Sequence, residues 1–207
     1  MADAAGAKAP RIIHPLFIRV THWVNAFAIF IMVLSGWRIY NASPLFGFEF
    51  PRGFTLGGWL AGALAWHFAG MWLLAINGMA YLAYGIFSGH FRRDFLPISL
   101  RRAINDVILA GQGRLDHAPG RYNAAQRLLY IGVILAVIVA IFSGLAIWKP
   151  VQLQGLTALI GGYETARLVH FFAMAVIVAF LVVHIGLAVM VKGVLAPMFT
   201  GRAEAQR

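Results

Sequence analysis

The sequence predicts an all-α fold, a transmembrane four-helix bundle with both termini in the cytoplasm. Of its 207 residues, 61% are hydrophobic and only 12% are charged, which is too apolar for a soluble domain. Four apolar runs are each long enough to cross a bilayer. Lysine and arginine gather beside one set of ends of these runs, which orients them. One membrane domain, residues 1–207, is expected.

The four expected spans follow from the apolar runs. They are Phe17–Tyr40, Leu56–Phe87, Ala125–Trp148 and Thr165–Val191. The second is the longest, and a long span can tilt or protrude from the bilayer. The first sixteen residues lack the apolar region of a cleaved signal peptide, so the first span is expected to anchor the chain itself.

The basic residues predict the orientation. Thirteen of the 17 lysines and arginines fall on the side that holds both termini and the loop 89–123. The other four are Arg38, Arg52, Lys149 and Arg167. The richer side is expected to be cytoplasmic. Because the charges flank apolar segments, membrane topology explains the net charge of +10 better than nucleic-acid binding does.

Two connecting segments are expected to form short helices. In the cytoplasmic loop, apolar residues recur at helical spacing over Leu96–Leu109, and Gly111 and Gly113 follow. This pattern is typical of a helix that lies in the membrane interface. Gln152–Ile160, on the outer side, is closed by two glycines in the same way.

The seven histidines fall into two groups. His14, His90 and His117 lie at or outside the membrane boundaries, where a titratable side chain is inexpensive and is expected to face solvent or headgroups. The other four lie inside expected spans: His22, His67, His170 and His184. A single one would more often be a hydrogen-bonded residue between helices. Four at matched depths indicate function.

The depths of these four histidines predict two pairs. His170 and His184 are fourteen residues apart, so they share one helix face and lie roughly 21 Å apart along the axis. His184 is roughly 11 Å before the cytoplasmic end of its span, and His22 is roughly 8 Å after the cytoplasmic start of its own. His67 and His170 are level near the outer surface. The expected pairs are His22 with His184, and His67 with His170.

Two stacked bis-histidine sites suit two b-type haems, each held axially between facing helices. The absence of cysteine excludes thiolate-bound zinc, iron–sulfur clusters and covalently attached c-type haem. A structural zinc ion needs four ligands around one point, and His170 and His184 are too far apart for that. The spans also lack Asp and Glu, which disfavours a cation transporter or proton relay.

Haem propionates need cationic partners near each surface. Arg19 precedes His22 by three residues, and Arg167 precedes His170 by three, so each arginine lies one turn toward the surface from a histidine. Arg38 and Arg52 are further candidates on the outer side. Ordinary placement of arginine at a membrane boundary explains all four equally well.

Glycines in the spans could let a flat ring approach the backbone, or could serve close helix packing. They are Gly36, Gly62, Gly70, Gly132, Gly144 and Gly186. The sequence does not separate these two explanations.

Four segments resemble the bacterial cytochrome b561 and nickel–iron hydrogenase b-type cytochrome family. They are RVTHW at 19–23, AWHFAGMW at 65–72, GRYNAAQRLLY at 120–130, and RLVHFFAM at 167–174 with a second histidine fourteen residues after the first. Formate dehydrogenase gamma subunits and thiosulfate reductase cytochrome b subunits are similar. The resemblance extends from about His14 to Lys192.

The resemblance implies two haems b with ligands at His22, His67, His170 and His184. It also implies electron exchange between a quinone near the cytoplasmic haem and a redox subunit on the periplasmic face. By likeness, Asn123 and Gln126 lie near the quinone; alternatively they only open the third span, with Asn123 as its N-cap.

Three functions are considered. The leading one is the electron-carrying membrane subunit of an oxidoreductase complex in the bacterial inner membrane, with a hydrogenase- or molybdoenzyme-like partner. The second is a stand-alone quinone-linked oxidoreductase that acts on a small oxidant or superoxide. The third is a haem-free transporter or scaffold.

Overall fold

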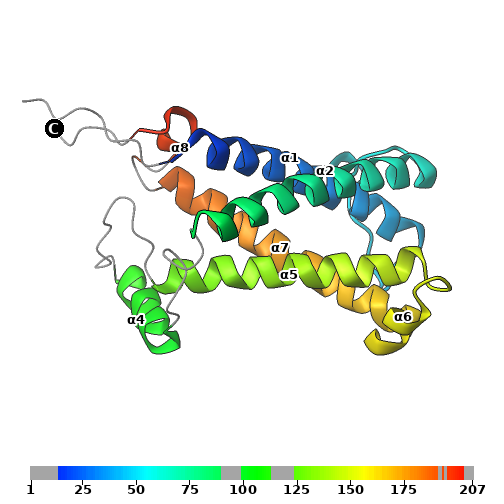
Figure 1. Ribbon diagram of the computed structural model, residues 1–207. Coiled ribbons are helices and arrows are strands. Elements are labelled where there is room, and N and C mark those ends of the chain that lie inside the picture. Colours follow the sequence, from blue (N-terminus) through cyan, green and yellow to red (C-terminus); the bar gives the residue numbers. More distant parts are fainter. Residues whose placement is uncertain (1–13, 90–98, 113–123, 191–192, 194, 203–207) are drawn as a thin grey trace, which may run out of the picture.

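Four long helices make up most of the computed structural model, which describes residues 14–89, 99–112, 124–190, 193 and 195–202 (Figure 1). They are α1 (Leu16–Ala42), α2 (Leu60–Phe87), α5 (Ala124–Trp148) and α7 (Tyr163–Met190). Each has 25 to 28 residues, about 37–42 Å at 1.5 Å per residue, and each is apolar enough to cross a membrane. The expected all-α four-helix fold is confirmed.

The helices run alternately up and down, which gives the bundle two distinct ends (Figure 1). We call the end that holds the start of α1 and the end of α7 the terminal end. The opposite end, which holds the α1–α2 and α5–α7 connections, is the loop end. The sequence predicts that the terminal end faces the cytoplasm.

The close backbone contacts lie within two helix pairs, α1 with α2 and α5 with α7, and are sparse between the pairs. Small residues permit this approach: Ala28, Ala63, Ala146 and Ala166 are fully buried. A Cβ on Gly70 of α2 would lie 2.9 Å from Cγ2 of Ile31 on α1. Gly70 therefore serves close helix packing, one of the two explanations that the sequence left open.

Large apolar side chains point away from the bundle along all four helices. Phe27, Trp72, Leu135 and Val182 are each more than half exposed. A soluble protein would not leave such surfaces in water. The chain is a multi-pass membrane protein, and lipid covers these side chains.

The second span begins later than the sequence predicts, at Leu60 instead of Leu56. Gly57 and Gly58 adopt φ of 105° and 68°, a left-handed conformation that ends regular helix and favours glycine. Leu56 instead donates its backbone N–H to the Leu34 carbonyl (3.0 Å) and lies against α1. The expected ends at Phe87 and Trp148 are correct, and the other boundaries of the long helices differ from the expected ones by one or two residues.

Among the described residues, three short helices flank the bundle, together with a 3₁₀ turn at Arg52–Phe54. They are α4 (Leu100–Gly111), α6 (Gln154–Ile160) and α8 (Pro197–Thr200). Gly161, with φ of 100°, caps α6 as the glycine pattern predicts. The expected helix at 96–109 is present from residue 100; residues 96–98 lie outside the described chain.

Asp106 of α4 caps the start of α5. Its Oδ2 accepts the backbone N–H groups of Ala124 (2.7 Å) and Ala125 (3.3 Å), which have no partner inside the helix. The predicted N-cap, Asn123, lies outside the described residues. This cap attaches α4, which lies between α2 and α5 in the chain, to the start of α5.

The loop after α1 is fixed by side chains from both helix pairs. Asn41 accepts from the Phe50 backbone N–H (2.9 Å) and donates to the Phe50 carbonyl (2.7 Å). Arg167 of α7 donates to the Ser43 carbonyl (2.6 Å) and to Glu164 (3.0 Å). The rings of this loop also contact Phe171 of α7. The loop end is therefore an ordered aromatic surface.

Candidate haem sites

At the loop end, His67 of α2 faces His170 of α7. The ring centroids are 6.3 Å apart, and the ring planes meet at 68°. The two histidines come from different helix pairs, so they face each other across the space between the pairs. His67 and His170 are the partners that their depths in the expected spans predict.

At the terminal end, His22 of α1 faces His184 of α7. Their ring centroids are 6.0 Å apart, with ring planes at 58°. Trp23 contacts His22 edge-on at 5.4 Å, and Phe180 stacks on His184 at 5.4 Å. This second pair also spans the space between α1/α2 and α5/α7.

Both ring separations match what an axially ligated metal requires. A metal–imidazole bond is about 2.0–2.1 Å long, and a ring nitrogen lies roughly 1.1 Å from its ring centre, so an ion between two imidazoles sets the centroids roughly 6.3 Å apart. The described residues contain no group of three or more His, Asp or Glu that could hold an ion. Two axial imidazoles per site fit a planar macrocycle that supplies the other donors, and the residues present therefore fit haem b.

The loop-end histidines are held at the nitrogen that would face away from a metal. The Ser35 Oγ lies 3.1 Å from Nδ1 of His67, and the Ser143 Oγ lies 3.1 Å from Nδ1 of His170. Nδ1 of His170 is also 2.9 Å from the Ala140 carbonyl. A ligand histidine commonly donates its second ring N–H to such a partner. The sequence reasoning missed both serines.

Two of the six glycines singled out from the sequence face imidazole rings. A Cβ on Gly36 would lie 3.5 Å from Cε1 of His67, and one on Gly144 would lie 3.1 Å from Cε1 of His170. Gly62 instead approaches the Gly57 carbonyl. Gly144 thus makes room for the His170 ring, whereas at Gly36 a Cβ would be in ordinary contact with the His67 ring.

Arg38 has donor capacity near the loop-end pair. It is one turn beyond Ser35 on α1, toward the surface. Its Nε, like Nε1 of Trp37, is buried without a hydrogen-bond partner among the described residues. A buried unpaired donor is costly, and a propionate oxygen would satisfy one. Arg38 therefore suits the predicted propionate role.

Arg167 is already engaged. Its guanidinium binds Glu164 and Ser43, and so it holds the loop described above. Its predicted contact with a propionate stays a prediction. Arg52 lies in the 3₁₀ turn of that loop.

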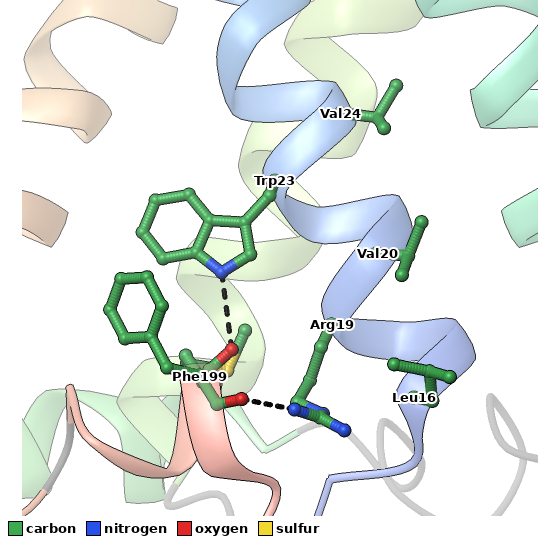
Figure 2. Close-up of a pocket in the computed structure, with 7 residues that line it drawn as sticks. Leu16, Arg19, Val20, Trp23, Val24 and Phe199 are labelled. Atoms are coloured by element: carbon green, nitrogen blue, oxygen red, sulfur yellow. Dashed lines mark hydrogen bonds between the residues drawn. The ribbon is translucent and has the colours of Figure 1, made fainter.

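Arg19 lies beside a hollow of about 300 Å³ where α8 docks on the start of α1 (Figure 2). Arg19 donates to the Phe199 carbonyl. Trp23 donates to the Met198 carbonyl (3.2 Å), and its ring stacks on Phe199 at 4.7 Å. Nε of Arg19 is buried without a partner in the described chain. One donor of Arg19 is thus used on α8, and another is still available to an anion.

His14 is half-buried against the C-terminal segment, where its backbone N–H donates to Gly201 (3.3 Å). The sequence analysis expected it to face solvent or headgroups. Burial, and then the neighbouring Arg19 guanidinium, lowers the pKa of His14 below its usual value. His90 and His117 lie outside the described residues.

Gln126, predicted to lie near a quinone, is half-buried in the first turn of α5 at the terminal end. One turn further along, Tyr130 contacts Phe180 at 6.3 Å, and Phe180 stacks on His184. A chain of contacts therefore connects this part of α5 with the terminal-end histidines.

A sequence model described as prokaryotic cytochrome b561 matches residues 13–201. The chain belongs to this family. Membership implies a b-type haem and an electron-transport role as a subunit in the bacterial inner membrane.

Individual cytochrome b561 relatives differ in the enzyme that their names mention. A putative protein-methionine-sulfoxide reductase subunit, YedZ1, of Azospira oryzae is 51% identical over 91% of this chain and 96% of its own length. A probable Ni/Fe-hydrogenase B-type cytochrome subunit of Bradyrhizobium diazoefficiens is 25% identical, over 91% of this chain and 83% of its own. The cytochrome b556(Fdn) subunit of the nitrate-inducible formate dehydrogenase of Escherichia coli K12 is 25% identical, over 96% and 87%. The resemblance noted from the motifs is thus confirmed.

Proposed function

We propose that the protein holds two haems b and connects a quinone at the terminal end with a catalytic partner subunit at the loop end. The observation that carries this proposal is the presence of two facing histidine pairs, at 6.3 and 6.0 Å, in the space between the helix pairs. His67 and His170 would hold one haem, and His22 and His184 the other. When bound, two haems b supply one-electron redox centres on either side of the membrane midplane.

The chain's own residues would hold and orient the cofactors. The four imidazoles would bind the haem iron, and α7 would set the separation of the two sites at roughly 21 Å along its axis. Arg38 would bind a propionate at the loop end with its buried Nε, and Arg19 would do so at the terminal end. The apolar helices would exclude water from both haem rings.

A quinone site at the terminal end is the part of the proposal that concerns substrate. A quinone needs an apolar slot for its tail and polar groups for its two carbonyls. Gln126 would supply a polar group there, next to the Tyr130 and Phe180 contacts that lead to His184. Asn123, which the resemblance also assigns to the quinone, lies outside the described residues. The expected cytoplasmic side offers water for the protons that leave an oxidised quinol.

The partner would dock at the loop end, on the ordered aromatic surface between α1 and α2. Phe48, Phe54 and Trp59 are exposed there. Because the relative with 51% identity is named as a methionine-sulfoxide reductase subunit, we propose a partner that reduces methionine sulfoxide in proteins. A quinol would give two electrons and two protons; the sulfoxide would take two of each and yield the thioether and water.

The first experiment tests the sites. Haem in the purified protein is counted by pyridine haemochrome, and the redox components are resolved by optical titration in wild type and in four single His→Ala variants. We expect two haems per chain. His67→Ala and His170→Ala should alter one component, and His22→Ala and His184→Ala the other. One haem per chain, or a different grouping of the variants, would contradict the assignment.

The second experiment tests the substrate side. Stopped-flow reduction by a quinol should be slower in Gln126→Ala and Asn123→Ala with both haem spectra intact. If only variants of the loop-end surface, such as Phe48→Ala, are reduced more slowly, the quinone binds at the loop end and the proposed terminal-end site is wrong.

A third experiment tests the partner. In native membranes, haem that has been reduced with quinol should be reoxidised when a protein that contains methionine sulfoxide is added. The same protein with unmodified methionine is the control. Equal reoxidation by both would exclude a sulfoxide-reducing partner.

A further inference from the structure

The two loop-end histidines are held by the same local structure on two different helices. Ser35–Gly36 on α1 faces His67, and Ser143–Gly144 on α5 faces His170. In each case the serine Oγ is 3.1 Å from Nδ1. At His170 the Ala140 carbonyl, three residues before the serine, also lies 2.9 Å from Nδ1. We call this arrangement the Ser-Gly step.

The hydroxyl protons in both Ser-Gly steps are already committed. The Ser35 hydroxyl donates to the Ile31 carbonyl at 2.5 Å, and the Ser143 hydroxyl donates to the Val139 carbonyl at 2.6 Å. A serine hydroxyl has one proton and two lone pairs. Each Oγ can therefore only accept at the ring, and each Nδ1 must carry the proton. The opposite nitrogen, Nε2, is then unprotonated and can bind a metal.

Burial makes these hydrogen bonds strong. Both serines are 0% exposed, and they are the largest fully buried side chains in the described protein. Away from water, a hydrogen bond is electrostatically stronger than at a surface. Oxygen atoms that accept from Nδ1–H, the serine Oγ at both rings and also the Ala140 carbonyl at His170, pull that proton away from the ring, which increases electron donation from Nε2.

The terminal-end pair has no such support within the described residues. His22 contacts Trp23, and His184 stacks on Phe180. Neither imidazole has a described side-chain hydrogen bond. The two candidate sites thus have the same type of side chain, but only the loop-end imidazoles have a described hydrogen-bond partner at Nδ1.

We propose that Ser35 and Ser143 are positioning residues that fix the Nδ1–H tautomer of His67 and His170 and lower the reduction potential of the loop-end haem. This inference rests on the proposed two-haem function. Greater electron donation from an axial ligand stabilises the ferric over the ferrous ion, which is why the potential falls. The terminal-end haem, without Ser-Gly steps, does not receive this effect.

The test is a potentiometric titration of the purified protein in three forms at each serine: wild type, Ser→Cys and Ser→Ala. A thiol has nearly the hydroxyl's position but is a weak acceptor, and a methyl group accepts nothing. We expect the midpoint potential of the loop-end component to rise in the order Ser, Cys, Ala at both positions. The terminal-end component should not move. The double variant Ser35→Ala/Ser143→Ala should show the largest shift.

Thr157→Ala is the matched control. Thr157 is a buried hydroxyl at the loop end whose described bonds go to the Leu153 and Ala146 carbonyls and to no imidazole. It should leave both potentials unchanged. An unchanged loop-end potential in both serine variants, or an equal shift in both components, would overturn the inference. If wild type lacks a loop-end haem, the proposed function itself fails, and that result is distinct because it needs no serine variant.

Discussion

Gly36 and Gly144 occupy equivalent places opposite the loop-end imidazoles, yet the structure predicts different results when each is replaced by alanine. A Cβ at position 144 would lie 3.1 Å from Cε1 and 3.4 Å from Nδ1 of His170. At position 36 the distances to the same atoms of His67 are 3.5 and 3.8 Å, ordinary contact distances. Gly144→Ala therefore has to move a ring by a few tenths of an ångström, and Gly36→Ala does not.

The size of that movement decides the expected effect. Metal–ligand distances tolerate about 0.2 Å, so the shift at position 144 is large enough to weaken an axial bond. Overpacking costs about 1–3 kcal/mol, against a gain of about 1 kcal/mol for alanine over glycine inside a helix. Gly144→Ala should be neutral to destabilising by about 2 kcal/mol, with reduced low-spin haem at the loop end. Gly36→Ala should be neutral or stabilising by up to about 1 kcal/mol.

The assay compares the two variants directly. Haem content by pyridine haemochrome, the low-spin signal of the loop-end component and the thermal midpoint in detergent are measured for each. Equal losses in both variants, or a greater loss in Gly36→Ala, would refute the distances and the role assigned to Gly144.

Three further predictions concern the packing around the sites. Asn77→Leu removes bonds to the Thr21 carbonyl (2.8 Å) and to Asn25 (2.7 Å) between α2 and α1; it should destabilise the bundle by about 0.6–1.7 kcal/mol in thermal unfolding. The pKa of His14 is lower in the folded protein than its unfolded value of 6.5. The unfolded state therefore binds more protons between these two values, and docking of 197–201 should weaken as the pH falls through that range. Hydrogen exchange of residues 197–201 should show this weakening, and His14→Gln should abolish its pH dependence. Arg167→Ala should expose the loop after Ser43 to proteolysis, whereas Arg52→Ala should not.

The sequence predicted the fold and the partner of each membrane histidine, because both depend on quantities that a sequence contains. Apolar length determines the spans, and distance from the span ends determines depth. The facing pairs agree with that depth argument, although ligation itself stays a prediction. The four-residue error at the start of α2 arose because composition alone does not reveal that Gly57 and Gly58 adopt positive φ.

The serines could not be predicted in this way. Whether Ser35 faces a neighbouring imidazole or lipid depends on the rotation of α1 about its axis, which apolar content on every face does not specify. A repeated Ser-Gly pair in the first and third spans is a signal that could have suggested it. Arg167 shows the converse, since its position one turn from His170 gave no hint that Ser43 would engage its guanidinium.

The concentration of close contacts within α1/α2 and within α5/α7 has a consequence for biogenesis. Each pair is continuous in sequence, residues 16–87 and 124–190, so each can enter the membrane as a separate helical hairpin during synthesis. The first hairpin carries His22 and His67, and the second carries His170 and His184. Neither site has both imidazoles until the second hairpin has inserted. Cofactor capture is therefore expected to be the last step of assembly, and it would add to the contacts of Arg167 and Phe171 that already join the two hairpins.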